Sequence, residues 1–178
     1  TAAIARATIR AALARVEAAF AADHGKVPGG GMAVLGLGRL GAANLTPTSD
    51  LDLVVLYEFS EKKRTSDGEK PLDAAVYHLR LTQRLVAALT VPTRRGRLFE
   101  VDLRLRPSGS KGPVATQFKG FVGYHESEAE LWEHMALTRA RVLAGPPEFQ
   151  ARIEKVITAV LRRKREPREV FRAVHDMR

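Results

Sequence analysis

The sequence lacks several residue types and patterns, and each absence excludes a class of protein. Its 178 residues include no cysteine. This excludes disulfides, thiolate metal sites and a cysteine nucleophile, and it is typical of proteins in a reducing cytosol. No apolar run is long enough to cross a bilayer, no signal peptide opens the chain, and the five histidines show no metal-ligand spacing. We therefore expect a cytoplasmic protein without a membrane partner.

The chain does contain enough apolar residues for one sizeable core, together with a marked excess of positive charge. Hydrophobic residues make up 45% of the sequence, which suits one or two folded domains. The formal net charge is +9, and a basic surface attracts nucleic acid, nucleotides, phosphates or an acidic partner protein. The basic run at residues 162–168 favours a solvated helix face. Because the chain opens on Thr1 and ends within a helical pattern, we expect it to be a piece of a longer protein.

Hydrophobic periodicity predicts both helices and strands. Helices are expected where apolar residues recur every three or four positions, and strands where short Leu- and Val-rich runs adjoin turn residues. The expected helices cover 2–21, a long segment opened by Pro71, 128–143, 147–164 and a last one from near Pro167. The expected strands cover 32–37, 51–57 and 98–105, and the charged segment 59–70 is expected to be a mobile loop. This order predicts an α+β fold, a small mixed sheet with packed helices followed by a helical segment.

Helical spacing also predicts which side chains face the core. In the first helix these are Ile9, Leu13, Val16 and Phe20. In the helix opened by Pro71 they are Leu72, Val76, Leu79, Val86 and Leu89. Trp132 is expected to be a core anchor between the helical segment and the sheet, and His134 is expected to be structural.

Two aspartates stand at the start of the predicted strand 51–57. Side chains alternate along a strand, so Asp50 and Asp52 point to the same face, with Cα atoms about 6.6 Å apart. Carboxylates this close repel each other, and a divalent cation such as Mg²⁺, which prefers carboxylate and phosphate oxygens, resolves the repulsion. Two solvated aspartates at the start of a strand are the alternative interpretation.

The predicted strand 98–105 adds a third carboxylate and two arginines. Its apolar face comprises Val101, Leu103 and Leu105, and its opposite face comprises Glu100, Asp102, Arg104 and Arg106. This pattern favours Asp102 as a further metal ligand, and arginine forks match phosphate oxygens in pairs. An Asp–Arg ion-pair ladder on an exposed sheet face is the alternative.

Three glycines lie at the end of the predicted strand 32–37. Gly36, Gly38 and Gly41 match the spacing G-x-G-x-x-G, but no full Rossmann unit follows and the lysine–serine pair of a P-loop is missing. Glycine after a strand still lets backbone N–H groups approach a phosphate closely, and Arg39 adds positive charge. A purely structural turn is the alternative.

These three pieces together resemble a known superfamily. A strand ending in glycines, a second strand opening with Asp-x-Asp and a third strand with one more carboxylate are similar to nucleotidyltransferases of the polymerase-β type. Gly38-Arg39 stands where that superfamily usually has Gly-Ser. Three blocks narrow the resemblance to the bifunctional glutamine synthetase adenylyltransferase/adenylyl-removing enzymes: GLGRLGAANLTPTSDLDLVVLYE (36–58), VDLRLRPSGSKGPV (101–114) and LWEHMALTRARVLAG (131–145). The resemblance implies a polymerase-β-like nucleotidyltransferase core over 1–112 and the start of a helical bundle over 113–178.

The resemblance also implies an activity and partners. LRPSG and WEHMALTRAR resemble the half of these enzymes that transfers AMP from ATP to a tyrosine of glutamine synthetase. The sibling half, which removes AMP by phosphorolysis and releases ADP, is one alternative. A non-catalytic module that binds nucleic acid is the other, although no nucleic-acid partner is expected. The signalling protein PII is an expected further partner, through the full-length enzyme.

Roles for individual residues follow from the same resemblance. It implies that Asp50, Asp52 and Asp102 are catalytic and hold two Mg²⁺ ions, an arrangement that fits two-metal phosphoryl chemistry. The residues implied to contact ATP are Gly38, Arg39, Gly41, Ser49, Arg104 and Arg106.

Overall fold

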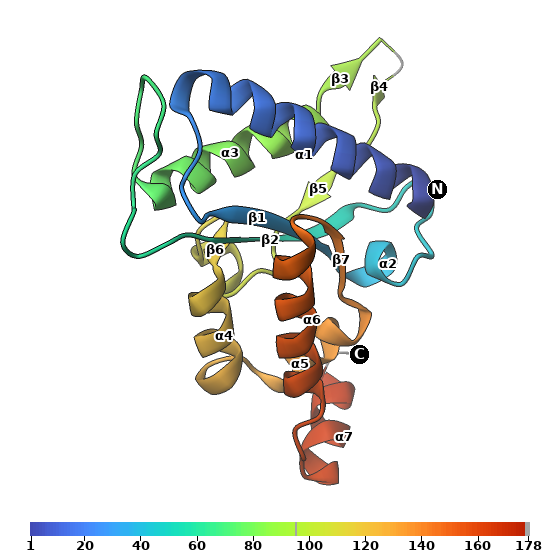
Figure 1. Cartoon of the computed structure of the whole chain (residues 1–178). Coiled ribbons are helices and arrows are strands. Elements are labelled where there is room, and N and C mark those ends of the chain that lie inside the picture. Colours follow the sequence, from blue (N-terminus) through green and yellow to red (C-terminus); the bar gives the residue numbers. More distant parts are fainter. Residues whose placement is uncertain (95, 177–178) are drawn as a thin grey trace.

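The computed structural model describes residues 1–94 and 96–176, and it shows a β-sheet with helices on both faces (Figure 1). The helices are α1 (Ala2–His24), α2 (Gly38–Gly41), α3 (Ala74–Leu89), α4 (Phe118–Ser127), α5 (Leu131–Ala136), α6 (Pro147–Leu161) and α7 (Pro167–Asp176), with 3₁₀ turns at Gly109–Lys111 and Leu137–Arg139. The strands are β1 (Gly31–Gly36), β2 (Leu51–Glu58), β3 (Pro92–Thr93), β4 (Gly96–Arg97), β5 (Val101–Asp102), β6 (Thr116–Gln117) and β7 (Arg141–Ala144). In the described part of the chain, no helix is long and apolar enough to span a membrane.

The sheet is mixed and is centred on β1 and β2. All of β1 pairs antiparallel with residues Leu53–Glu58 of β2, and β7 pairs antiparallel with the other edge of β1. Two short strands pair parallel with the outer edge of β2, β5 at its first residues and β6 at its last. The prediction of a small mixed sheet with packed helices is therefore confirmed, with the strand order β5–β2–β1–β7. Because β6 and β7 both follow residue 112, the predicted division between 1–112 and 113–178 runs through this sheet.

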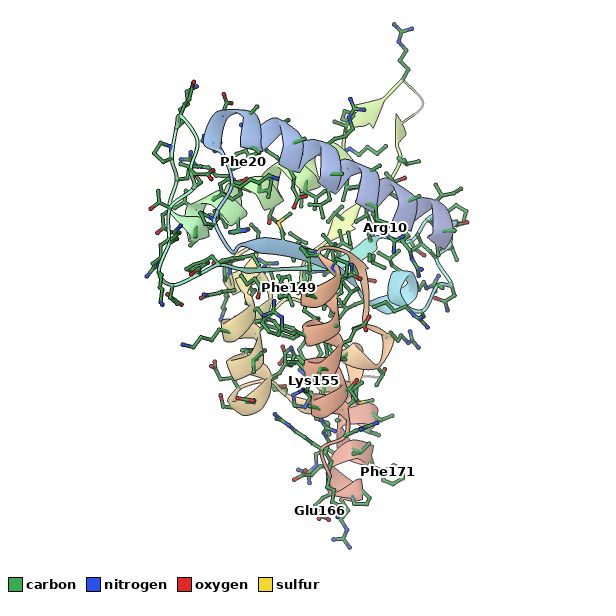
Figure 2. All side chains as sticks on the ribbon, in the orientation of Figure 1. Arg10, Phe20, Phe149, Lys155, Glu166 and Phe171 are labelled. Atoms are coloured by element: carbon green, nitrogen blue, oxygen red, sulfur yellow. The ribbon has the colours of Figure 1, made fainter. Side chains whose placement is uncertain are left out.

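Side-chain alternation along β2 separates the core into two layers. Leu51, Leu53, Val55 and Tyr57 belong to the cluster that packs against α1 and α3. Val54 and Leu56 point the other way, into the cluster formed with α4 and α6. Figure 2 shows the two layers through Phe20 of α1 and Phe149 of α6, which lie on opposite sides of the sheet. Asp52 shares its parity with Val54 and Leu56, so its side chain belongs to the α4–α6 face.

The α1–α3 layer confirms one predicted helix face and corrects the other. Ile9, Leu13 and Phe20 of α1 are buried as predicted. In α3 Leu89 is buried as predicted, but Val76 is 38% exposed. The rest of the buried side carries Ala74, Tyr77, His78, Leu81, Thr82 and Leu85. The Tyr77 ring, which meets the Phe20 ring edge-on at a centroid distance of 4.8 Å, sets this face. The helix begins after Asp73, whose side chain accepts a hydrogen bond from the Ala75 amide, because a capping carboxylate satisfies a free first-turn N–H.

Two further predictions are corrected at the second layer. The predicted helix 128–143 is divided into α5, a 3₁₀ turn and β7, because the backbone of residues 141–144 completes the free edge of β1. Trp132 is not a core anchor, since it is 39% exposed. Its indole nitrogen donates to Glu130 at 2.9 Å. His134 is buried, in agreement with a structural role.

The third predicted strand is much shorter than expected. Only Val101 and Asp102 of the predicted 98–105 pair with β2. The Asp102 carboxylate accepts a hydrogen bond from the Arg104 amide at 2.8 Å. A side chain that captures the amide two residues ahead forms a turn in place of a strand ladder, and the alternation predicted beyond Asp102 is therefore lost.

The loop after β2 is tied to the end of α1 over its second half. Ser66 is buried and accepts a hydrogen bond from the Leu72 amide. The Asp67 carboxylate accepts one from the Lys26 amide, and the Gly68 amide donates to the His24 carbonyl. The mobility predicted for 59–70 stays a prediction, and the structure shows that the second half of this segment is hydrogen-bonded to the end of α1 and to Lys26.

Candidate active site

The structure places two of the predicted acidic residues side by side. Asp52 on β2 and Asp102 on β5 are register partners in a parallel strand pair. Paired residues on neighbouring strands lie about 4.8 Å apart and point to the same face of the sheet. Asp50 immediately precedes β2, and its charge also acts on Asp52. Asp52 and Asp102, which are 50 positions apart in the sequence, are thus brought together as predicted.

Negative charge at this point is only partly compensated. Burial raises the pKa of Asp52, and the neighbouring carboxylates of Asp102 and Asp50 raise it further. Arg104 opposes this shift. A half-buried carboxylate next to two others is more stable when a cation is bound.

The glycine turn lies directly against Asp52. The Leu37 amide donates to the Asp52 carbonyl at 2.9 Å, which joins the end of β1 to the start of β2. Gly38 opens α2 with φ of +49°, in the left-handed region, and a Cβ there would overlap the Asp52 carboxylate. Glycine is therefore required at this position both for its conformation and for the approach of the turn to the acid.

The third sequence block supports the same turn from outside. A Cβ at Gly41 would overlap the backbone carbonyl oxygens of Arg139 and Gly36. The 3₁₀ turn Leu137–Arg139 thus packs on α2, a contact that the sequence reasoning missed. The sequence signal for this contact is Gly41 itself, because glycine allows two backbone segments to approach closely.

Arg39 lies in α2, and Ser49 lies on the loop between α2 and β2. The Ser49 hydroxyl accepts a hydrogen bond from the Thr46 amide at 3.1 Å and bonds the Thr46 hydroxyl at 2.6 Å. Arg39 donates weakly to that same hydroxyl at 3.5 Å. The two predicted ATP contacts therefore share one neighbour, Thr46, at the exposed end of the glycine turn.

Arg104 and Arg106 have different surroundings. Arg104 bonds Asp102, and its side chain is 78% exposed. Arg106 is buried, and its guanidinium donates to the backbone carbonyls of Leu103, Ser110 and Gly112. Through these bonds the Arg106 guanidinium braces the loop after β5, whereas the Arg104 guanidinium bonds an acidic residue.

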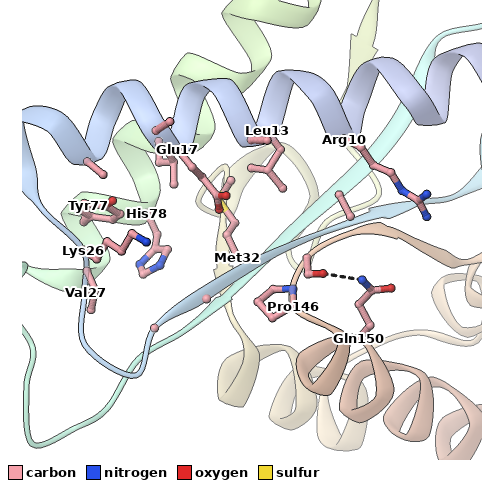
Figure 3. A pocket seen from close by; sticks show the side chains of 18 residues that line it. Arg10, Leu13, Glu17, Lys26, Val27, Met32, Tyr77, His78, Pro146 and Gln150 are labelled. Atoms are coloured by element: carbon pink, nitrogen blue, oxygen red, sulfur yellow. Dashed lines mark hydrogen bonds between the residues drawn. The ribbon is translucent and has the colours of Figure 1, made fainter.

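A cavity lies on the α1–α3 face of the sheet, and its lining does not include the acidic residues. It has a volume of about 660 Å³ between α1, α3 and the edge of β1. Figure 3 shows Glu17, Lys26 and His78 among its lining, with Gln150 bonded to the Gly145 carbonyl at its rim. Because this cavity shares no residue with the carboxylates and the glycine turn, it is not the candidate active site.

The donor chemistry of the acidic residues fits a magnesium ion. Three carboxylates supply hard oxygen ligands. Burial is the main cause of the raised pKa of Asp52, and the charges of Asp102 and Asp50 add a repulsion that a divalent cation relieves. Within residues 1–94 and 96–176, however, no three acidic or histidine side chains converge closely enough to hold a metal ion. Asp102 is instead engaged by Arg104.

Comparison with known proteins identifies the family. The family model described as glutamate-ammonia ligase adenylyltransferase matches residues 1–156. A bifunctional glutamine synthetase adenylyltransferase/adenylyl-removing enzyme of Xanthobacter autotrophicus is 52% identical over 176 residues, which cover 98% of this chain and 18% of that protein. Enzymes with the same name from a Bradyrhizobium species and Brucella suis are each 51% identical, over 89% and 94% of this chain. The chain spans 16% to 18% of the length of these relatives. With more than half of its residues matched by the family model, the chain belongs to the glutamate-ammonia ligase adenylyltransferase family.

Proposed function

We propose that this chain carries an adenylyl-transfer site that moves AMP from ATP to a tyrosine of glutamine synthetase. The observation that carries the proposal is the pairing of Asp52 and Asp102 on adjacent strands, with the Gly38 turn packed against Asp52. A glycine turn beside clustered carboxylates is suited to a triphosphate and its metal ions. We also propose that the sheet has the arrangement found in polymerase-β-like nucleotidyltransferases.

Asp50, Asp52 and Asp102 are the residues that would hold Mg²⁺. Bound there, Mg²⁺ supplies Lewis-acid stabilisation of charge on the triphosphate and lowers the pKa of the attacking tyrosine hydroxyl. The phenolic oxygen forms a bond to the α-phosphorus of ATP, the α–β phosphate bond breaks, pyrophosphate leaves and the phenolic proton passes to solvent.

The chain's own residues bind and orient the nucleotide. The Gly38–Gly41 turn places backbone amides near Asp52, and Arg39 adds positive charge at its exposed end. Ser49 holds the following loop through Thr46. We assign Arg104 to the phosphates and Arg106 to the loop that carries Asp102, on the strength of its bonds to three carbonyls.

The direction of the reaction and the partners are also part of the proposal. LRPSG and WEHMALTRAR support the adenylylating half. The names of the relatives support glutamine synthetase as the protein substrate. PII is proposed as a further partner, through the rest of a longer enzyme.

The test is transfer of label from α-labelled ATP to unmodified glutamine synthetase in the presence of Mg²⁺. We expect labelled glutamine synthetase with the native chain and with the matched surface variant Glu61→Gln, and none with Asp52→Asn. Equal labelling by Asp52→Asn contradicts the site. Release of ADP from adenylylated glutamine synthetase and phosphate, without labelling in the forward assay, assigns the chain to the removing half instead.

A further inference from the structure

Among the three acidic residues, Asp102 alone has a bound partner. Arg104 donates its amide to Oδ1 at 2.8 Å, its Nε to Oδ2 at 2.8 Å and its Nη2 to Oδ2 at 2.6 Å. Both oxygens of Asp102 are therefore used by one residue. In the described part of the chain, the side chains of Asp50 and Asp52 accept no hydrogen bond and form no ion pair.

The two members of this ion pair differ in their freedom to move. The Asp102 side chain is only 14% exposed and is fixed by the pairing of β5 with β2, whereas the Arg104 side chain is 78% exposed. Because the Arg104 side chain reaches solvent, water can solvate its guanidinium when the ion pair opens. Moving the Arg104 guanidinium would leave the Asp102 carboxylate in place beside Asp52.

A carboxylate oxygen that accepts hydrogen bonds from a guanidinium is not free to ligate a metal ion. Opening the Arg104 side-chain bonds would free Oδ2 of Asp102, while the amide of Arg104 keeps Oδ1 oriented. The freed guanidinium would carry a positive charge and a planar fork next to any bound nucleotide. Forks of this kind bind phosphate oxygens in pairs.

We infer that Arg104 is a displaceable counter-ion: it neutralises Asp102 before the divalent cation binds, and cation binding transfers its guanidinium to a nucleotide phosphate. This inference rests on the proposed function, because it requires a metal site at Asp50, Asp52 and Asp102. Competition between Arg104 and the cation weakens binding of the cation alone. The new phosphate contact strengthens binding of ATP once the cation is present, so the two ligands bind cooperatively.

Mn²⁺ binding without nucleotide, measured by electron paramagnetic resonance, tests the first half of the inference. Arg104→Ala is expected to bind Mn²⁺ about fivefold more tightly than the native chain, because the competing cation is gone. Arg97→Ala is the matched control: it removes the same charge and frees Glu100, the partner of an exposed ion pair outside the site. The control is expected to change Mn²⁺ affinity less than about twofold, since screening weakens charges at a distance.

ATP binding, measured by calorimetry, tests the second half. With EDTA present, Arg104→Ala is expected to leave the ATP affinity within about twofold of the native value, since Arg104 is then engaged with Asp102. With saturating Mn²⁺, the same variant is expected to bind ATP about fivefold more weakly. If Arg104 only braced the loop, its replacement would not strengthen the binding of Mn²⁺ and weaken the binding of ATP.

The contrary results separate the two proposals. If Arg104→Ala weakens Mn²⁺ binding, Arg104 positions Asp102 as a brace and the counter-ion inference is overturned. If Asp52→Asn abolishes Mn²⁺ binding but Arg104→Ala leaves it unchanged, the counter-ion inference fails while the metal site stands. If no variant or native chain binds Mn²⁺, or if Asp52→Asn binds it normally, the metal site of the proposed function fails as well. Circular dichroism melting of each variant establishes that it is folded.

Discussion

Replacement of His125 by phenylalanine should remove a specific loss of stability at mildly acidic pH. His125 of α4 is 5% exposed, and its ring packs against Phe121 at a centroid distance of 4.5 Å. Burial lowers its pKa from the ordinary 6.5 to about 4, with further lowering by His134 and Arg163. Its Nδ1 atom is buried and has no hydrogen-bond partner among residues 1–94 and 96–176. The ring therefore behaves as a buried aromatic group that must stay neutral.

The size and sign of the effect follow from linkage between protonation and folding. The unfolded chain takes up this proton near pH 6.5, and the folded chain only near pH 4. The contribution of neutral His125 is therefore fully present above about pH 6.5 and is lost as pH falls toward about 4. Between about pH 7.5 and pH 5 the expected loss is ~2 kcal/mol, and the complete loss is ~3 kcal/mol. His134, whose pKa is also lowered by burial, adds a loss of the same sign.

Urea denaturation at several pH values measures the effect. The native chain should lose stability on acidification, and His125→Phe should lose about 2 kcal/mol less between about pH 7.5 and pH 5. Near pH 7.5 the variant should be about as stable as the native chain, because the substitution keeps a ring and removes an unpaired nitrogen. His24→Gln, at the end of α1, is the control for loss of a histidine. A variant that keeps the native dependence on pH would refute the assignment of this loss to His125.

Three further predictions concern stability, each measured by the midpoint of urea unfolding. Gly41→Ala should destabilise the chain by about 2 kcal/mol or more, because the added Cβ meets backbone that cannot yield, whereas Gly123→Ala, in an open position of α4, should stabilise it by about 0.5 kcal/mol; equal effects would contradict the packing of the glycine turn. Arg106→Ala should cost about 2 kcal/mol, since it removes the bonds from a buried guanidinium to three loop carbonyls. A neutral result would mean that the loop does not depend on Arg106. Trp132→Ala should cost less than about 1 kcal/mol and Phe149→Ala about 3 kcal/mol or more, because Phe149 is 1% exposed and Trp132 is 39% exposed; the reverse order would restore Trp132 as a core anchor.

The central strands and the acidic residues could be predicted from the sequence because strong local patterns determine them. The apolar run of β2 is buried on both faces, so its pattern is continuous and easily identified. Asp52 and Asp102 were expected together on the basis of motif order, and strand pairing places them together. No metal or nucleotide contact of these residues is tested by the fold itself, and those roles stay predictions.

The remaining features depend on interactions that a one-dimensional pattern does not contain. The predicted strand 98–105 ends early because the Asp102 side chain binds the Arg104 amide, a local competition that alternation of residue types does not reveal. The segment 141–144 follows helical residues in sequence but becomes β7, because the edge of β1 requires hydrogen-bond partners. Trp132 was expected in the core as an anchor between the helical segment and the sheet, but its indole bonds the neighbouring Glu130 and the side chain is partly exposed.

The contact between Gly41 and the Arg139 carbonyl has a consequence for how such sites can be recombined. Two segments almost a hundred positions apart fit each other backbone to backbone, where no side chain can adjust to a changed partner. A chimera that takes residues 36–58 from one adenylyltransferase and residues 131–145 from another therefore brings together two backbone segments that are not matched to each other. The two segments should therefore be exchanged together, so that the glycine turn and the 3₁₀ turn that packs on it come from the same protein.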